Sequence, residues 1–211
     1  MASSVIHMAV ASEINKVLNR NYKFILIGSI TPDLSKLVGH NRNKSHFITD
    51  KPDIPNLDSF LSKYKQYLND DFVLGYYIHL YTDYIWFKYF LTDYIKDKYV
   101  YDKNNNKLKL NPDKLLKYIY NDYNSLNIKL IDKYKIDLSI LNKEYKIKQI
   151  IKEIPINKVY LLLNNTKNII NNSKETKTYL FNMYSIEKFI SFTVQVLLND
   201  LKNLGFYKVW Q

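Results

Sequence analysis

The chain has 211 residues, of which 46% are hydrophobic and 24% charged, so it can bury a core, and the disordered and fibrous classes are excluded. It has no cysteine, which excludes disulfides, thiolate metal clusters and cysteine nucleophiles, so any metal site must use His, Asp or Glu. The net charge of +11 comes almost entirely from lysine, and the shortage of arginine argues against sequence-specific nucleic-acid binding.

The charge and hydropathy patterns also bear on location. Residues 94–211 hold 21 basic and 11 acidic side chains, so the excess positive charge is spread along the second half, as on a solvated surface. The longest apolar runs are far shorter than the roughly 20 residues that cross a bilayer. No Lys or Arg precedes the apolar residues at the beginning of the sequence, unlike in a secretory signal. We therefore expect a cytoplasmic protein.

Helical spacing dominates the first half of the chain. Ser3 or Ser4 can cap a first helix whose inner face runs from Ile6 to Val17 and includes His7. The apolar run 24–27 is predicted to close at Gly28. The chain from there to Pro55 is polar and is predicted to be a loop. Apolar residues at helical spacing then predict helices over 57–68 and 70–95, and the second of these has the strongest pattern.

The second half is predicted to be helical as well. Asn111 and Pro112 are the cap and first-turn proline of another helix. Weaker periodic stretches cover 137–153 and 158–170, with breaks at Pro155 and in the Asn-rich segment 164–172. A last helix runs over 186–204 and ends at Gly205, and the role of Trp210 is left open. We expect one all-α, single-domain multi-helix bundle over 1–211, with a metal-site half over 1–95 and a Lys/Asn-rich helical half over 96–211.

All four histidines lie in the first 79 residues. His79 and Asp83 are four residues apart in the helix 70–95, so their side chains share a face and can ligate one cation. Burying Asp83 requires a counter-charge, and no Lys or Arg lies between Lys65 and Lys88, so a metal ion is a candidate. The alternative for this pair is a hydrogen-bonded helix surface or a core histidine.

Three further candidate ligands each have an ordinary alternative. His7 lies on the inner face of the first helix and can be a core histidine. Asp33 follows Pro32 and can cap a turn, and His46 follows Ser45 in a polar loop and can be exposed. Lys44 and Arg42 lie close to His46 and can meet a substrate phosphate, or can be solvated loop residues.

These five residues stand in a recognisable order. A helix with His near its start, then GSITPDL, then KSHF, then GYYIHLYTDYIW, resembles the zinc-dependent phospholipase C family over about residues 3–90. The resemblance implies an all-α fold shared with single-strand-specific zinc nucleases. It also implies that Asp33, His46, His79 and Asp83 surround one metal ion, that His7 and a bridging Asp83 hold a second, and that Asp33 is the candidate general base.

The chain departs from the family in two places. Family members complete their metal cluster with further His and Glu residues, and this chain has no histidine after His79. They also use the amino group of an amino-terminal Trp, whereas this sequence begins Met1-Ala2-Ser3. His40 is an alternative ligand or an exposed loop residue. We expect one or two zinc ions as cofactor, with manganese or iron as alternatives.

The resulting hypothesis is a metal-dependent hydrolase that uses an activated water on a phosphate-containing substrate, a phosphomonoester or phosphodiester. Two alternatives remain open. The chain can be a catalytically inactive helical binding or scaffold protein with a structural metal, or a single-strand nucleic-acid phosphodiesterase that uses its lysines. Neither nucleic acid nor more than a peripheral membrane contact is expected from the residues, and the oligomeric state is left open.

Overall fold

The computed structural model describes residues 1–50, 53–96, 99–109 and 111–206 of the chain, so Trp210 lies outside the described residues. The fold is all-α, as predicted, with a small three-stranded sheet. The first half contains the following elements: α1 (Ser4–Leu18), α2 (Tyr22–Ile30), the 3-10 turn η1 (Thr31–Asp33), α3 (Leu34–Leu37), α4 (Arg42–Ser45), α5 (Leu57–Tyr64), the 3-10 turn η2 (Lys65–Tyr67), α6 (Asp71–Ile85), the π-helical turn η3 (Trp86–Phe90) and α7 (Leu91–Tyr94).

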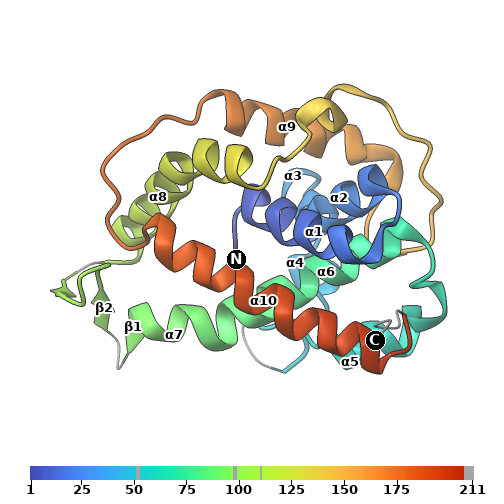
Figure 1. Ribbon diagram of the computed structural model, residues 1–211, viewed down its shortest axis with the longest axis horizontal. Helices are drawn as coiled ribbons and strands as arrows, with labels where there is room; N and C mark the ends of the chain where they lie inside the picture. The colour runs from blue at the N-terminus through green and yellow to red at the C-terminus, as the bar shows by residue number, and fades with distance from the viewer. Residues whose placement is uncertain (51–52, 97–98, 110, 207–211) are drawn as a thin grey trace.

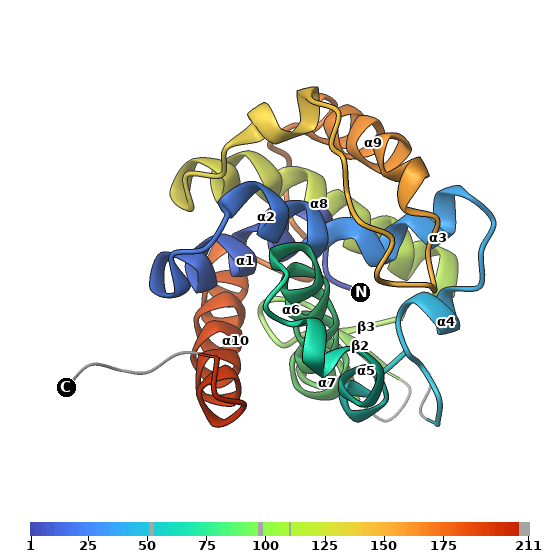
Figure 2. The ribbon, with the colours of Figure 1, turned by 90° about the vertical axis from the view of Figure 1, so that its right-hand side faces the viewer.

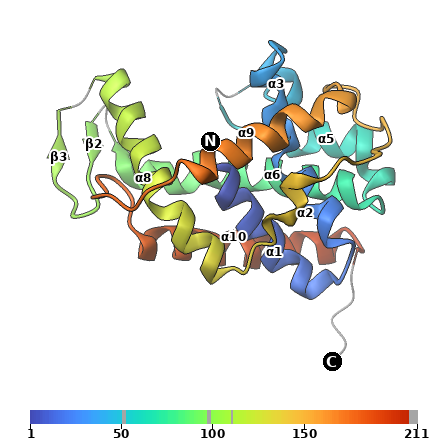
Figure 3. The ribbon, with the colours of Figure 1, turned by 90° about the horizontal axis from the view of Figure 1, so that it is seen from above.

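The second half begins with the sheet and continues with long helices. Its elements are β1 (Ile95–Lys96), β2 (Tyr99–Tyr101), β3 (Lys107–Leu108), α8 (Pro112–Lys133), the 3-10 turns η4 (Leu138–Asn142) and η5 (Ile156–Lys158), α9 (Val159–Asn171) and α10 (Met183–Asn203). The strands are antiparallel in the order β1-β2-β3, with Val100 opposite both Ile95 and Leu108. Figures 1 and 3 show this sheet projecting from one end of the helical body.

The helices form three tiers. α1 and α2 occupy the middle, α8 and α9 lie on one side of them, and α5, α6 and α10 lie on the other (Figures 1 and 2). α6 is apolar on nearly all sides because α1, α2, α5 and α10 pack around it. The buried hydrophobic side chains of all three tiers belong to a continuous cluster.

The predicted helix starts and stops are mostly confirmed. The Ser3 side chain accepts the N–H of Ile6 at the start of α1, and Asn111 accepts the N–H of Lys114 at the start of α8. Gly205 has a φ of 84° directly after α10, a left-handed conformation that glycine adopts without strain. Val17 is an exception, because it is 52% exposed rather than on the inner face of α1.

Four local predictions are wrong. α2 continues through Gly28 to Ile30, and two short helices, α3 and α4, interrupt the predicted loop before Pro55. The predicted helix over 137–153 is only the turn η4, and at the end of that stretch the Gln149 side chain bonds to the backbone of residues 151, 154 and 156 in place of helical hydrogen bonds. α9 continues through the Asn-rich segment to Asn171.

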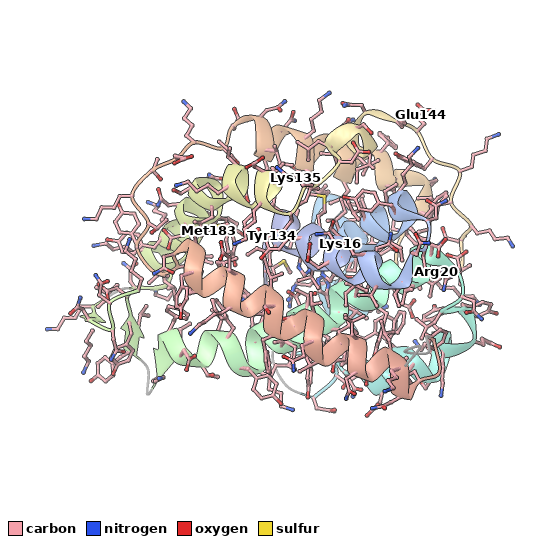
Figure 4. All side chains as sticks on the ribbon, viewed as in Figure 1. Lys16, Arg20, Tyr134, Lys135, Glu144 and Met183 are labelled. Atoms are coloured by element: carbon pink, nitrogen blue, oxygen red, sulfur yellow. The ribbon has the colours of Figure 1, made fainter. Side chains whose placement is uncertain are left out.

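Lysine charge is spread over the surface. In Figure 4, long side chains with nitrogen tips project from both ends and the upper edge of the molecule. The Ser12 hydroxyl of α1 donates to the carbonyl of Tyr134, the residue after α8, at 3.4 Å. This bond holds the end of α8 against α1.

Candidate metal centre

His79 and Asp83 lie on the central helix α6, and both side chains are fully buried. Asp70 caps this helix by accepting the N–H groups of Phe72 and Val73. The Nδ1 of His79 lies 2.8 Å from the Ser29 carbonyl, which can only accept, so Nδ1 carries the proton. The Nε2 atom of His79 therefore presents its lone pair to the interior, the orientation that backbone carbonyls commonly impose on metal-binding histidines.

A close helix crossing brings α2 to this face of α6. A Cβ atom on Gly28 would lie 2.2 Å from the Phe72 carbonyl oxygen, and one on Gly75 would lie 2.2 Å from the Ile25 carbonyl oxygen. Neither backbone oxygen can move aside, so both positions need glycine for this approach. The crossing places the end of α2 and the turn η1, with Asp33, next to His79.

His7 reaches the same point from α1. Its ring stacks on that of His79 with a centroid distance of 3.8 Å and an interplanar angle of 11°. The Nε2 atom of His7 lies 3.4 Å from Oδ1 of Asp83. The same Asp83 oxygen accepts the backbone N–H of Ala2 at 3.1 Å, so the segment before α1 also contacts the cluster.

Asp33 and His46 close the cluster from the segment between α2 and α5. His46 follows α4 and is fully buried, so the alternative of an exposed loop histidine is excluded. Its Nε2 atom lies 3.2 Å from Nε2 of His79 and 3.4 Å from Oδ1 of Asp33. Its Nδ1 atom is 2.9 Å from the Ser45 hydroxyl, which fixes the ring.

The five candidate residues thus meet at one place and form two groups that could hold a metal ion. His7, His79 and Asp83 form one group, and Asp33, His46 and His79 form the other, with the ligand atoms of each group within 4.8 Å of one another. His79 belongs to both groups. Oδ2 of Asp83 lies 3.7 Å from Nε2 of His79 and 3.8 Å from Nε2 of His46, so Asp83 faces both.

The donor atoms fit a metal ion because several of them make only ion-pair contacts of 3.4 Å or longer, and no hydrogen bond, to their neighbours. Oδ1 of Asp33, Oδ2 of Asp83 and both ring nitrogens of His7 are buried and make no hydrogen bond within the described part of the chain. Buried polar atoms are otherwise nearly always paired. The neighbouring donor atoms lie 3.2 to 3.8 Å apart, and ligands of a tetrahedral zinc ion with bonds of about 2.0 Å lie about 3.3 Å apart.

Two cations contact the edge of the cluster. The Lys36 ammonium lies 3.4 Å from Oδ1 of Asp33, and Nη2 of Arg42 lies 4.0 Å from Oδ2 of Asp83. Asp83 therefore has a cationic neighbour, Arg42, that comes from outside α6. The absence of Lys and Arg from the sequence between Lys65 and Lys88 did not indicate this neighbour. Burial acts to raise the pKa of Asp33, but Lys36, His46 and His79 outweigh it and hold that pKa well below its usual value. Burial lowers the pKa of His79, which keeps the ring neutral.

A pocket of about 850 Å³ opens beside the cluster. Asp33, Lys36 and Arg42 line it, and α8 and α9 contribute about half of its lining residues, many of them apolar. Asp33 is the member of the cluster that reaches the pocket wall, and His7, His46, His79 and Asp83 are 0% exposed. A ligand in the pocket can therefore contact the cluster through Asp33.

The remaining predictions for the site are resolved as follows. His40 is exposed, as its loop position suggested, and belongs to neither group. Lys44 is exposed and Arg42 lines the pocket. Sequence reasoning missed Lys36, although its position three residues after Asp33, one helical turn away, was a usable signal.

Comparisons with protein-family models, with curated proteins and with solved structures find no significant match to this chain. Within the described ranges, each helix is too short or too polar to cross a membrane.

Proposed function

We propose that this protein is a metal-dependent hydrolase of a phosphoester, with zinc as the first candidate metal and manganese or iron as alternatives. The observation that carries the proposal is the convergence of buried His and Asp donor atoms, several without a hydrogen-bond partner among the described residues, beside a pocket that Lys36 and Arg42 also line. Imidazole and carboxylate ligands suit all three metals.

The ligands proposed are His7, Asp33, His46, His79 and Asp83, for one or two ions. A bound ion of this kind polarises phosphate oxygens and acidifies a water molecule. The protein contributes fixed ligand orientation, because His79 is held by the Ser29 carbonyl and His46 by the Ser45 hydroxyl. It also excludes bulk water, since four of the five ligands have no exposed surface.

Asp33 is the proposed catalytic residue because it belongs to the cluster and also lines the pocket. Its lowered pKa keeps it ionised, so it orients the attacking water by accepting a hydrogen bond from it. In the net reaction the water oxygen forms a bond to phosphorus and the bond to the ester oxygen breaks. The alcohol leaves with one proton of the water, and the other goes to the phosphate product or to solvent; Asp33 is placed to pass this proton on, since its low pKa prevents it from keeping the proton.

Lys36 and Arg42 are the proposed contacts to the substrate phosphate. Asp53 accepts a hydrogen bond from Nη1 of Arg42 at 2.9 Å, and the guanidinium carbon lies 5.8 Å from the centroid of the Phe87 ring. These contacts hold the guanidinium while Nη2 remains near the cluster. An oriented guanidinium is well suited to a phosphate, because its fork of N–H groups matches two oxygens.

The two alternatives differ in what they require of this site. A structural metal site is closed by protein ligands and needs no charged pocket, so Asp33, Lys36 and Arg42 at the pocket wall favour hydrolysis. A nucleic-acid phosphodiesterase needs a positively charged track along its surface. The lysines project from several sides of the molecule in Figure 4, which gives no single track in that view.

The test begins with metal content, measured by mass spectrometry on protein purified without chelator. We expect one to two equivalents of zinc, manganese or iron in the natural protein and less than a tenth of that in Asp83→Ala. Hydrolysis of p-nitrophenyl phosphate and bis-p-nitrophenyl phosphate is then followed with each metal added. The matched control is Asp137→Ala, an exposed aspartate far from the ligands in sequence, which should keep both metal and activity.

The outcomes separate the possibilities. Metal that Asp83→Ala loses, together with hydrolysis that Asp33→Asn loses while retaining the ion of the group His7, His79 and Asp83, supports the proposal. Metal without hydrolysis of either ester points to the structural alternative. No metal in the natural protein after reconstitution contradicts the proposal.

A further inference from the structure

The helices α8 and α9 line one part of the pocket, and they lie far along the sequence from the candidate metal ligands. At about 850 Å³ the whole pocket is in the range of known small-molecule sites, about 300 to 1,000 Å³. Leu115 and Ile119 of α8 and Leu162 and Ile170 of α9 line this part with apolar surface. Such a surface matches the organic group of an ester better than it matches a second charge.

Polar residues of α8 and α9 also line the pocket, and two of them are almost fully buried. Asn127 of α8 and Thr166 of α9 both line the pocket, and each is only 1% exposed. Oδ1 of Asn127 and Oγ1 of Thr166 have no hydrogen-bond partner in the described portion of the chain. A buried acceptor and a buried hydroxyl without partners are destabilising, so a partner from outside the chain is expected to satisfy them.

The Asn127 amide has one atom without a hydrogen-bond partner, and the contact of its other atom identifies which one it is. Its Nδ2 donates to the Ser173 hydroxyl at 3.0 Å, and Ser173 donates onward to the Ile169 carbonyl at 2.9 Å. These bonds orient the amide so that its oxygen is the group left over. The pocket therefore has an acceptor at Asn127.

The hydroxyl of Thr166 lacks the hydrogen bond to the carbonyl four residues earlier that two other buried threonines make. Thr31 and Thr82 each donate to the carbonyl four residues earlier, at 2.6 and 2.7 Å. Thr166 makes no such bond, so its hydroxyl can both donate and accept. An acceptor on α8 and a donor-acceptor on α9, both in the lining of one pocket, together complement an alcohol group, which also donates and accepts.

We propose that Asn127 and Thr166 form a polar recognition pair that binds a hydroxyl group on the organic part of the substrate. This inference rests on the proposed function in placing the phosphate near Asp33, Lys36 and Arg42. The substrate class is then a phosphoester of a mainly apolar alcohol that carries a second hydroxyl group. Apolar side chains of α8 and α9 line the same pocket as both polar groups.

The test compares matched ligands on the metal-loaded, full-length protein. Calorimetry measures binding of n-alkyl phosphonates and of the corresponding ω-hydroxyalkyl phosphonates, from butyl to decyl, to the natural protein. These phosphonates stand in for the alkyl phosphates and have no ester bond to hydrolyse. We expect that at one chain length the hydroxylated ligand binds about tenfold more tightly, the effect of one added hydrogen bond to groups otherwise unpaired. Equal affinities within every matched pair would overturn the proposal.

The variants assign the preference to the pair. Thr166→Val removes the hydroxyl, keeps the shape of the side chain and leaves no buried donor unpaired, so it should fold. It should abolish the preference while leaving alkyl phosphonate binding unchanged. The matched control is Thr193→Val, since Thr193 also has a buried, unpartnered hydroxyl but does not line the pocket. A preference that survives in Thr166→Val overturns the assignment.

A phosphate-free series separates this proposal from the proposed function. Amide NMR shifts of α8 and α9 are followed on titration with n-alkanols and the matching alkanediols. A diol preference that Thr166→Val abolishes, without binding of any phosphonate, supports the recognition pair and counts against the phosphoesterase. No hydroxyl preference in either series rejects the pair, whatever the metal and hydrolysis experiments show.

Discussion

Two fully buried aspartates, Asp83 and Asp122, are stabilised in opposite ways. Asp122 of α8 accepts three backbone N–H groups, from Tyr179 at 2.8 Å, Leu180 at 2.6 Å and Phe181 at 2.8 Å. Asp83 of α6 accepts one, from Ala2, and its second oxygen makes no hydrogen bond within the described residues. The surroundings of Asp83 are instead three imidazole rings and one distant guanidinium.

The difference separates a structural charge from a ligand. The segment before α10 wraps around Asp122, so this carboxylate is satisfied by the fold itself. Asp83 is surrounded by groups that are themselves candidate metal ligands, and its second oxygen makes no hydrogen bond among the described residues. Burial alone does not identify a functional carboxylate in this protein. The count of unfilled acceptor positions does.

The largest expected effect tests the structural side of the comparison. Asp122→Ala leaves three buried N–H donors without an acceptor, so we expect the free energy of unfolding to fall by about 3 to 5 kcal/mol. Urea denaturation followed by circular dichroism measures it. The exposed Asp137, which accepts the N–H of Ser139, is the control, and Asp137→Ala should cost about 1 kcal/mol. Equal losses in the two variants would remove the distinction.

Metal removal tests the other side. At a free metal concentration a hundred times its Kd, the bound ion should add about 2.7 kcal/mol to the free energy of unfolding, and chelation should remove this increment. Asp83→Asn should show no difference with and without chelator, whereas Asp137→Asn should respond like the natural protein. If the chelator does not destabilise the natural protein, Asp83 is a structural carboxylate like Asp122.

The two regions should also differ in pH dependence. Amide donors around Asp122 do not titrate, but burial lowers the pKa of His79 below its usual 6.5. Below a pH of about 6.5, His79 is protonated in the unfolded chain but stays neutral in the folded, metal-free protein. The free energy of unfolding therefore falls by up to about 1.4 kcal/mol for each unit that the pH is lowered. Unfolding of chelated protein between neutral pH and pH of about 5 measures this slope, and His79→Gln should flatten it. A slope unchanged in the variant contradicts the assignment.

The smallest effect concerns the guanidinium beside Asp83. If Arg42 binds the substrate phosphate and is not needed to balance the charge of Asp83, Arg42→Lys should retain stability and metal content. It should raise KM about fivefold, because an ammonium group cannot bind two phosphate oxygens at once as a guanidinium does. Steady-state kinetics on the better nitrophenyl ester measures KM. The control is Lys44→Ala, in the same segment but exposed, which should leave KM unchanged. Loss of metal from Arg42→Lys would instead assign Arg42 to the cluster.

Local signals explain which parts of the fold the sequence predicted. Ser3, Asn111 and Gly205 act on their own helix ends through neighbouring backbone groups, so a sequence pattern is sufficient to find them. The Gln149 loop was missed because its side chain replaces helical hydrogen bonds, and nothing in the periodicity of 137–153 shows that choice.

The site was predictable only in part for a similar reason. The five candidate ligands could be proposed together because their order and neighbours resemble a known pattern. Asn127 and Thr166 carry no such pattern, and they became visible only when the packing left their polar atoms unpaired. His46 shows the same limit, because a polar segment predicts exposure until α4 turns the ring inward.

The contact between Gly28 and Gly75 offers a way to find related proteins when overall sequence similarity is undetectable. Because the crossing of α2 and α6 fixes the ligands against each other, a glycine should precede each motif at a set spacing. Gly28 lies one helical turn and a 3-10 step before Asp33, and Gly75 lies one turn before His79 and two turns before Asp83. A sequence search could use only these two glycines and the candidate ligands at their set spacing and ignore every other position. Such a search would detect relatives that share the geometry of the site.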